Sequence, residues 1–123
     1  MAITFDTATA SNAVGASSVT YSHTVGTGSN TIIVGQPSFV DLVAGSASIS
    51  SVTYAAVGMT LVPSSTQTFT TAGGAYDSIV ANYGLVAPAT GANNVVCTAS
   101  ESCDAIACGS QSWFGVRQVS SFG

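Results

Sequence analysis

The sequence predicts an all-β fold, an antiparallel β-sandwich of jelly-roll or immunoglobulin-like type with about seven or eight short strands. Apolar and polar residues alternate with a period of two, which is typical of half-buried strands. Runs of Gly, Ser, Asn and Thr interrupt this alternation about every ten residues, and no stretch has the periodicity of an amphipathic helix. A chain of 123 residues can bury its own core, so we expect a single domain over residues 1–123.

The clearest pair of strands lies in residues 51–64, SVTYAAVGMTLVPS. Val52 and Tyr54 share one face of the first predicted strand, and Met59 and Leu61 share one face of the second. The small residues between the two strands predict a tight turn.

Before this pair, the chain begins with two predicted strands, residues 3–6 and 18–25, joined by a linker of small residues at 7–17. The second strand has one mostly apolar face formed by four residues, Val19, Tyr21, His23 and Val25. The sequence GTGSN at residues 26–30 predicts a turn, with two glycines that can take positive φ.

Residues 31–34 are apolar on both faces and predict a central strand, which Pro37 is expected to end. Residues 39–44, FVDLVA, fit either a strand or one helical turn. Residues 64–74 predict an exposed loop with a weak strand around Phe69.

The C-terminal third is predicted to contain one interrupted strand and one hairpin. Residues 76–86 predict a strand with a break near residues 82–84. Residues 94–98 and 103–116 predict the two arms of a hairpin, with a tight turn at residues 99–102.

The chain carries little charge. Charged residues make up 5% of the sequence, against roughly 25% in an ordinary soluble domain, and the net charge is −4. One Arg and no Lys cannot form the basic patch that nucleic acids or anionic membranes require, so we expect neither as a partner. A surface of Ser, Thr, Gly and Asn lacks the Lys and Glu that discourage association, which favours a chain packed against neighbours. The alternative is a stable extracellular monomer.

No apolar run approaches the roughly 20 residues of a membrane span. Residues 1–6, MAITFD, show neither the basic nor the apolar region of a signal peptide. If Met1 is the start, we expect synthesis in a cytoplasm without standard export.

The three cysteines allow three interpretations: a disulfide within the chain, a disulfide between subunits, or no disulfide. If the predicted hairpin turns near Ser102, Cys97 lies opposite Cys108 at about 4.5 Å between Cα atoms, within disulfide range. Cys103 is then left over as a candidate intersubunit thiol. The third interpretation is that all three are reduced, small apolar residues. Their spacings lack the CxxC element of structural zinc sites, so we expect no metal and no cofactor.

Catalytic residues are not indicated. His23 is the single histidine and lies on an apolar strand face, which predicts a buried or interface histidine rather than part of a Ser-His-Asp triad. We therefore expect a protein that is not an enzyme. Among ligands, a sugar is the best alternative, with Trp113 and Tyr83 as candidate stacking residues, although core packing is the favoured explanation for the aromatic residues.

Two segments, VTYAAVGMTLV at residues 52–62 and LVAPATGANNVV at 85–96, carry a resemblance. They are similar to a family of mostly uncharacterised β-sandwich domains in phage and bacterial surface proteins. The pattern covers most of the chain and contains no catalytic motif. This chain has Ala55 and Ala56 where the family pattern has two glycines.

The resemblance implies a non-enzymatic structural protein of a virus particle, such as a phage capsid decoration or minor virion protein. Its expected partners are further copies of itself and other shell proteins of the virion, and its expected location is the virion. The alternative is a carbohydrate-binding module of a phage fibre or bacterial surface protein, located outside the cell or on its surface.

Overall fold

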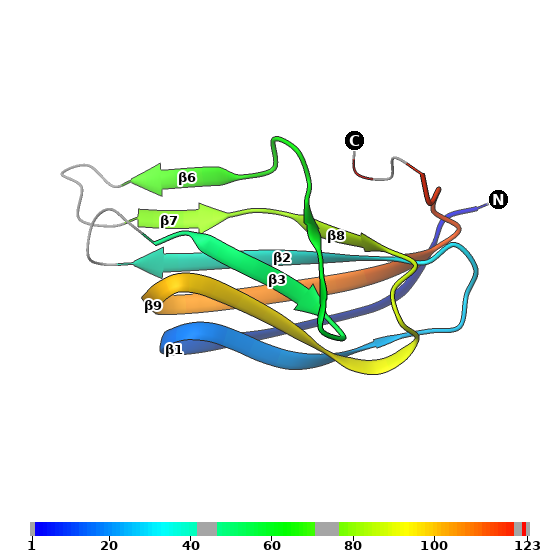
Figure 1. Cartoon of the computed structure of the whole chain (residues 1–123), viewed down its shortest axis with the longest axis horizontal. Coiled ribbons are helices and arrows are strands. Elements are labelled where there is room, and N and C mark those ends of the chain that lie inside the picture. The colour runs from blue at the N-terminus through cyan, green and yellow to red at the C-terminus, as the bar shows by residue number, and fades with distance from the viewer. Residues whose placement is uncertain (1, 42–46, 71–76, 120–121, 123) are drawn as a thin grey trace.

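The structure, a computed structural model, describes residues 2–41, 47–70, 77–119 and 122. Parts of the predicted segments 39–44, 64–74 and 76–86 therefore lie outside the described residues. The described part is all-β and antiparallel, without a helix, which confirms the predicted fold class. Its nine strands form one sheet that folds over on itself into a sandwich-like half barrel (Figure 1).

Two of the strands are much longer than the other seven. In chain order the strands are β1 (Thr4–Val25), β2 (Ile32–Asp41), β3 (Ile49–Tyr54), β4 (Val57–Gly58), β5 (Thr60–Leu61), β6 (Gln67–Thr70), β7 (Asp77–Val80), β8 (Tyr83–Val86) and β9 (Gly91–Phe114). β1 has 22 residues and β9 has 24, and they pair antiparallel along nearly their whole length.

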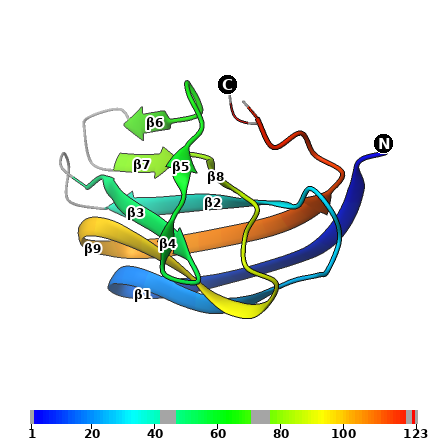
Figure 2. The ribbon, with the colours of Figure 1, turned by 45° about the vertical axis from the view of Figure 1, so that its right-hand side comes forward.

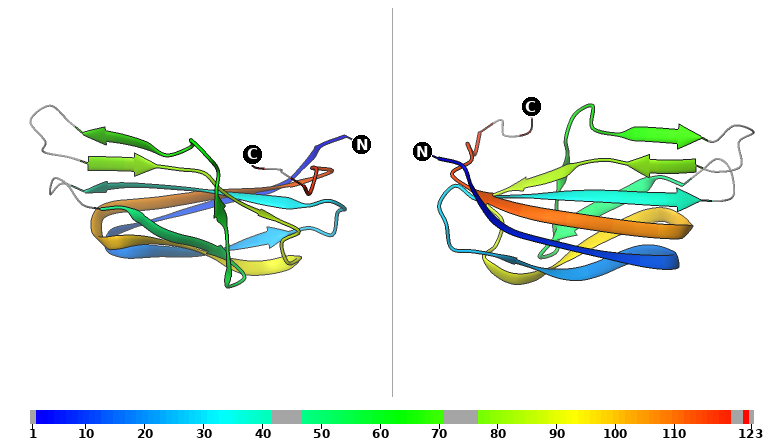
Figure 3. Two further views of the ribbon diagram at one scale, coloured as in Figure 1. Left: turned by 45° about the horizontal axis from the view of Figure 1, so that its top comes forward. Right: turned by 180° about the vertical axis from the view of Figure 1, so that it is seen from behind.

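These two strands belong to both layers. The N-terminal half of β9 lies between β1 and β3, and its C-terminal half lies between β1 and β2. Between the pairs Ala16–Cys103 and Ser18–Thr98 the ladder is interrupted. There both strands fold over at the same end of the molecule, as Figure 2 shows. The two layers therefore share β1 and β9, and Figure 3 (right) shows the orange half of β9 between β1 and β2.

This arrangement corrects two predictions. Residues 99–102 are not a hairpin turn, because β9 continues through them as one bent strand. Residues 7–17 are not a linker, because they pair with the C-terminal half of β9 and form the middle of β1. Small residues suit a strand when a long partner supplies the ladder hydrogen bonds, and Gly15, with φ of 60°, marks the bend.

Pro37 does not end β2, contrary to the prediction. β2 pairs with β8 up to Gly35 and with β7 from Ser38 onward, so Pro37 lies where one neighbour gives way to the next. Its carbonyl accepts a hydrogen bond from the Ala81 N–H on that side, at 3.3 Å. The N–H and C=O of a strand residue point to the same side. The N–H that Pro37 lacks would therefore point into the gap between β7 and β8, where no strand partner needs it.

The short strands follow the predictions more closely. The predicted interruption of the strand at 76–86 lies at residues 81–82, between β7 and β8. The weak strand around Phe69 is β6, which pairs with β7 and is exposed along its length. Leu61 was predicted to share a buried face with Met59, but it is exposed, because β5 leaves β3 and pairs with β8 instead.

The predicted alternation places the core correctly in the central strands. Val52 and Tyr54 of β3 are buried, as is the apolar face of the second half of β1. The buried cluster between the layers consists of Val19, Val25, Ile33, Phe39, Val52, Tyr54, Met59, Val95, Cys97, Ala99, Cys103, Ile106 and Cys108.

The structure shows the backbone conformation of two predicted turns. Gly26 and Gly28 do not have positive φ; instead a Cβ on Gly28 would overlap the ring of Phe114, so the aromatic ring requires glycine there. The hairpin between β3 and β4 turns at Ala55 and Ala56, with φ of 50° and 63°. Two consecutive residues with positive φ are typical of a type I′ turn, which favours Asn-Gly or Gly-Gly.

Candidate functional site

A cluster of polar side chains that the sequence did not predict lies buried between the layers. His23, from the second half of β1, is fully buried, as are Ser110 and Ser112 of β9. Asp6 and Thr9 come from the first half of β1. Ser110 and Ser112 continue the inward-facing series of Ile106 and Cys108 at every second residue. This periodicity indicates that they face the core, but it does not indicate which side chains they meet there.

The hydrogen bonds of this cluster fix the proton positions on His23. Ser112 Oγ donates to Asp6 Oδ2 at 2.7 Å, so it can accept from His23 Nε2–H at 3.1 Å. The single lone pair of Nδ1 then faces two hydroxyls, that of Ser110 at 3.0 Å and that of Thr9, and accepts from one of them at a time. The two hydroxyls lie 3.5 Å from each other. Burial lowers the pKa of His23, and the opposing effect of the Asp6 carboxylate is smaller. The imidazole is therefore neutral at neutral pH, with its proton on Nε2.

This arrangement is not a catalytic triad. In a triad the imidazole lies between the carboxylate and the hydroxyl, and the hydroxyl faces the substrate. Here Ser112 lies between Asp6 and His23, and neither Ser112 nor His23 is exposed to solvent. The cluster instead joins the two halves of β1 to the end of β9, and its Asp6 carboxylate also accepts from the Gly26 N–H at 2.9 Å.

Cys97 and Cys108 come together, although not through the predicted hairpin. One lies in each half of β9, and the fold of that strand brings their buried side chains into contact across the core. The hydrogen bond between the thiols raises the pKa of Cys97, which burial raises further, and lowers the pKa of Cys108. Both thiols are free in this structure. A bridge between them stays a prediction, which intact mass with and without reductant would measure.

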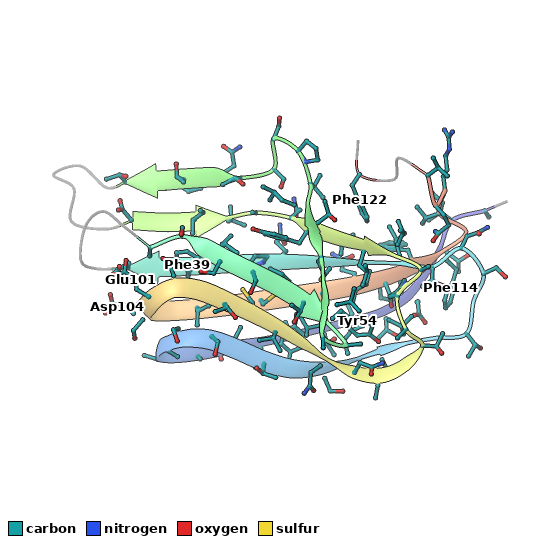
Figure 4. All side chains as sticks on the ribbon, in the orientation of Figure 1. Phe39, Tyr54, Glu101, Asp104, Phe114 and Phe122 are labelled. Carbon is teal, nitrogen blue, oxygen red and sulfur yellow. The ribbon has the colours of Figure 1, made fainter. Side chains whose placement is uncertain are left out.

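Cys103 is placed poorly for the intersubunit role. Its side chain is buried, and burial together with the nearby carboxylates of Asp41, Glu101 and Asp104 raises the pKa of its thiol. Since the thiolate is the reactive form, a buried thiol among acids exchanges slowly. Figure 4 shows Glu101 and Asp104 at the end where β9 bends, far from Phe114 at the other end.

Trp113 and Tyr83 do not form one sugar-stacking platform. Tyr83 pairs with Gly35 and packs against the core, where burial raises its pKa. Trp113 alternates with buried Ser112 and therefore lies on the opposite, outer face of the sheet. There its ring meets Phe5 edge to face, with 5.2 Å between the centroids.

The long outer edge of β1 is the most unusual surface of the molecule. In the described part of the chain β1 pairs with β9 alone, so its other edge is open. Residues 7–25 contain no Asp, Glu, Lys, Arg or Pro, and the single histidine among them faces the core. At the far side of the sheet, β6 forms a second, short edge, with Phe69 exposed.

The described residues contain no group of three or more His, Cys, Asp or Glu suited to a metal ion. None of the elements in the described ranges is a helix able to cross a membrane. Comparisons of the chain with protein-family models, curated proteins and solved structures find no match. The resemblance to phage and bacterial surface domains therefore stays a prediction.

Proposed function

We propose that this chain is a non-enzymatic structural protein that assembles edge to edge through β1. The assembly forms part of a virus particle, as a capsid decoration or minor virion protein that contacts further copies of itself and other shell proteins. The observation that carries the proposal is the open edge of β1, because natural proteins normally protect such an edge.

Protection of an edge strand takes a few known forms: short length, charged side chains, proline, a β-bulge or a covering loop. β1 has irregularities between Phe5 and Thr7 and between Ala16 and Ser18, but its pairing with β9 is regular over residues 7–16 and again over residues 18–25. β1 has 22 residues, and residues 7–25 contain neither charge nor proline on the exposed positions. About half of the N–H and C=O groups of an edge strand point outward, so roughly ten residues here offer both a donor and an acceptor. A second copy related by a two-fold axis would satisfy them with an antiparallel β1.

The distribution of charge supports a second copy of the chain as the partner of β1. Glu101 and Asp104 lie at the bend of β9, and Asp41 and Asp77 are paired in register at the ends of β2 and β7. On β1 the one acid is Asp6, which is occupied in the buried polar cluster. Two copies can thus approach along β1 without bringing like charges together. Many such contacts across a shell give strength through multivalency.

The test is the molar mass of the purified protein by light scattering, with and without reductant. We expect a dimer or larger assembly in both conditions, because the contact is hydrogen-bonded rather than a disulfide. Replacing Ser22→Lys together with Thr24→Lys places two cations on the edge, and we expect this variant to be monomeric.

The matched control is Ala92→Lys with Asn94→Lys. These residues pair with Thr24 and Ser22, so the same two charges lie on the same face one strand further in. This variant should assemble like the unmodified protein. A chain that is monomeric at all accessible concentrations, or an assembly that both variants preserve, would overturn the proposal.

A further inference from the structure

A groove of about 450 Å³ lies on the outer face of the sheet, where β1, β9 and β2 run side by side. Its floor is formed by three small residues, Ala8, Ala10 and Gly109. Its sides carry three amide side chains, Gln36, Asn82 and Gln111. The volume falls in the range of about 300–1,000 Å³ that is usual for ligand sites.

The strand register explains why the face is hollow at this place. Gly109 of the central strand pairs with Ala10 on one side and Gln36 on the other. Gln111, two residues along β9, points to the same face. Since Gly109 has no side chain and Ala10 only a methyl group, the two glutamines stand above a low floor.

We propose that this groove binds a neutral carbohydrate chain. Each amide side chain offers both hydrogen-bond donors and an acceptor, and each sugar hydroxyl does the same, so the two groups pair in either direction. None of the residues lining the groove is ionisable, which leaves a charged ligand without a counter-charge. The small floor lets the flat face of a sugar ring approach the sheet closely.

Trp113 adds a stacking surface next to the groove. It follows Gln111 on the same face of β9, and its partial exposure leaves part of the indole open beside the edge contact with Phe5. Sugar rings are apolar on their faces and polar at their rims. An aromatic ring next to a row of amide side chains can therefore stack on one sugar and hydrogen-bond to the next. Of the two aromatic residues considered for sugar stacking, Trp113 fits this site and Tyr83 does not.

This inference goes beyond the proposed structural role and does not depend on it. The groove lies on the face of the sheet, whereas assembly uses the edge of β1, so a docked copy leaves the groove open. The monomeric edge variant can therefore be tested for binding as well, and assembly and binding can fail separately.

Gly109→Val is the sharpest test, because a side chain there would fill the floor of the groove. A Cβ at Gly109 would meet Ala10 Cβ and the Thr9 carbonyl oxygen at 4.0 Å, an ordinary contact, so the fold can accept it. The control is Gly58→Val on β4, where a Cβ meets nothing within 4 Å and the position is outside the groove. A second variant, Gln36→Ala with Gln111→Ala, removes two amides without adding bulk.

The probes are maltohexaose, cellohexaose, laminarihexaose and chitohexaose, with a heparin hexasaccharide as the charged comparison. Titrations followed by amide NMR would report both the affinity and the place of binding. We expect saturable binding of at least one neutral hexasaccharide, with shifts at Gly109 and Gln111. The affinity should fall about tenfold or more in both groove variants and stay unchanged in Gly58→Val.

Three results would overturn the proposal. They are the absence of saturable binding to every neutral hexasaccharide, binding that both groove variants retain, and a preference for the charged hexasaccharide. Urea unfolding of each variant would show that a loss of binding is not a loss of fold.

Discussion

Two regions of the molecule can be compared: the long ladder formed by β1 and β9, and the short strands β4, β5 and β6, which we call the rim strands. They differ in the backbone conformation and the burial of their residues. In the ladder, the buried polar groups of His23 and Ser112 are hydrogen-bonded and the apolar side chains around them are packed. Residues at or near the rim adopt positive φ without being glycine: Ala55, Ala56, Ser64 and Ala87. Large apolar side chains are exposed in both regions: Val57, Leu61 and Phe69 in the rim strands, and Phe5 and Val14 on β1.

The difference shows where the stability of the fold is concentrated. Long-range pairing joins the two ends of the chain in the ladder, from Phe5–Trp113 to Val25–Gly91. The rim strands are two to four residues long and each adds few contacts. Changes in the ladder should therefore be severe, and changes in the rim should be mild or even favourable.

The largest effect is expected from Ile106→Ala, in the middle of β9. Ile106 is fully buried between the layers, so truncation leaves a cavity that β9 cannot close without moving both layers. We expect a loss of about 3–4 kcal/mol in the free energy of unfolding, measured by urea denaturation. Ile3→Ala, at a residue that is 64% exposed, should change it by less than about 0.5 kcal/mol. Equal losses in the two variants would contradict the special role of the ladder.

Ser112→Ala should come next, because it removes the link between Asp6 and His23. The His23 Nε2–H is then buried without an acceptor, which costs about 2 kcal/mol of unfolding free energy. Ser22→Ala, an exposed serine on β1, is the control and should be close to neutral. If the two serine variants unfold at the same urea concentration, the buried cluster does not stabilise the fold.

The pH dependence of stability should report the same cluster. Since burial lowers the pKa of His23 in the folded state, the unfolded chain binds the proton first as the pH falls. Stability should therefore decrease below about pH 6.5, by up to about 1.4 kcal/mol per pH unit, until the folded pKa is reached. Urea midpoints at intervals between pH 8 and pH 5 would measure this slope. The slope should disappear in His23→Gln, and its persistence there would assign it to another group.

The smallest effect is expected at the rim and has the opposite sign. Ala56 has φ of 63° in the tight turn between β3 and β4, where glycine has no Cβ to strain. Ala56→Gly should raise the free energy of unfolding by about 1 kcal/mol. Ala92→Gly, at an exposed strand position without positive φ, should instead lower it by about 0.5–1 kcal/mol. A loss of stability in both variants would mean that the turn is not strained.

Alternation in the sequence was sufficient for the fold class and for much of the core. It placed Val52 and Tyr54 on the buried face of β3, and it placed His23 on the buried face of β1. The predicted break near residues 82–84 overlaps the interruption at 81–82 between β7 and β8 but extends into β8. These predictions succeed because the period of two is a local property, set by which side of a strand each residue faces.

The candidate sites were less predictable, because each depends on residues brought together by long-range pairing. The buried cluster joins Asp6 to Ser112, and the groove joins Ala10 to Gly109 and Gln36. Nothing in the local sequence distinguishes these residues from the many other small polar residues of the chain. The prediction of Cys97 beside Cys108 named the right pair but the wrong route, since their contact crosses the core.

The sequence by itself determined an all-β chain with a weakly charged surface, because both follow from composition and periodicity. Only the tertiary structure decided that residues 7–17 and 99–102 continue strands rather than end them. Small residues such as Ala, Ser and Thr are compatible with either turn or strand, and their own preference is too weak to choose. The choice is made by the partner strands. β9 holds residues 7–16 of β1 extended, whereas at the bend of β9 Ala99 pairs with Ile49 of β3 and the Ser100 N–H donates to the Ser48 carbonyl at 2.8 Å.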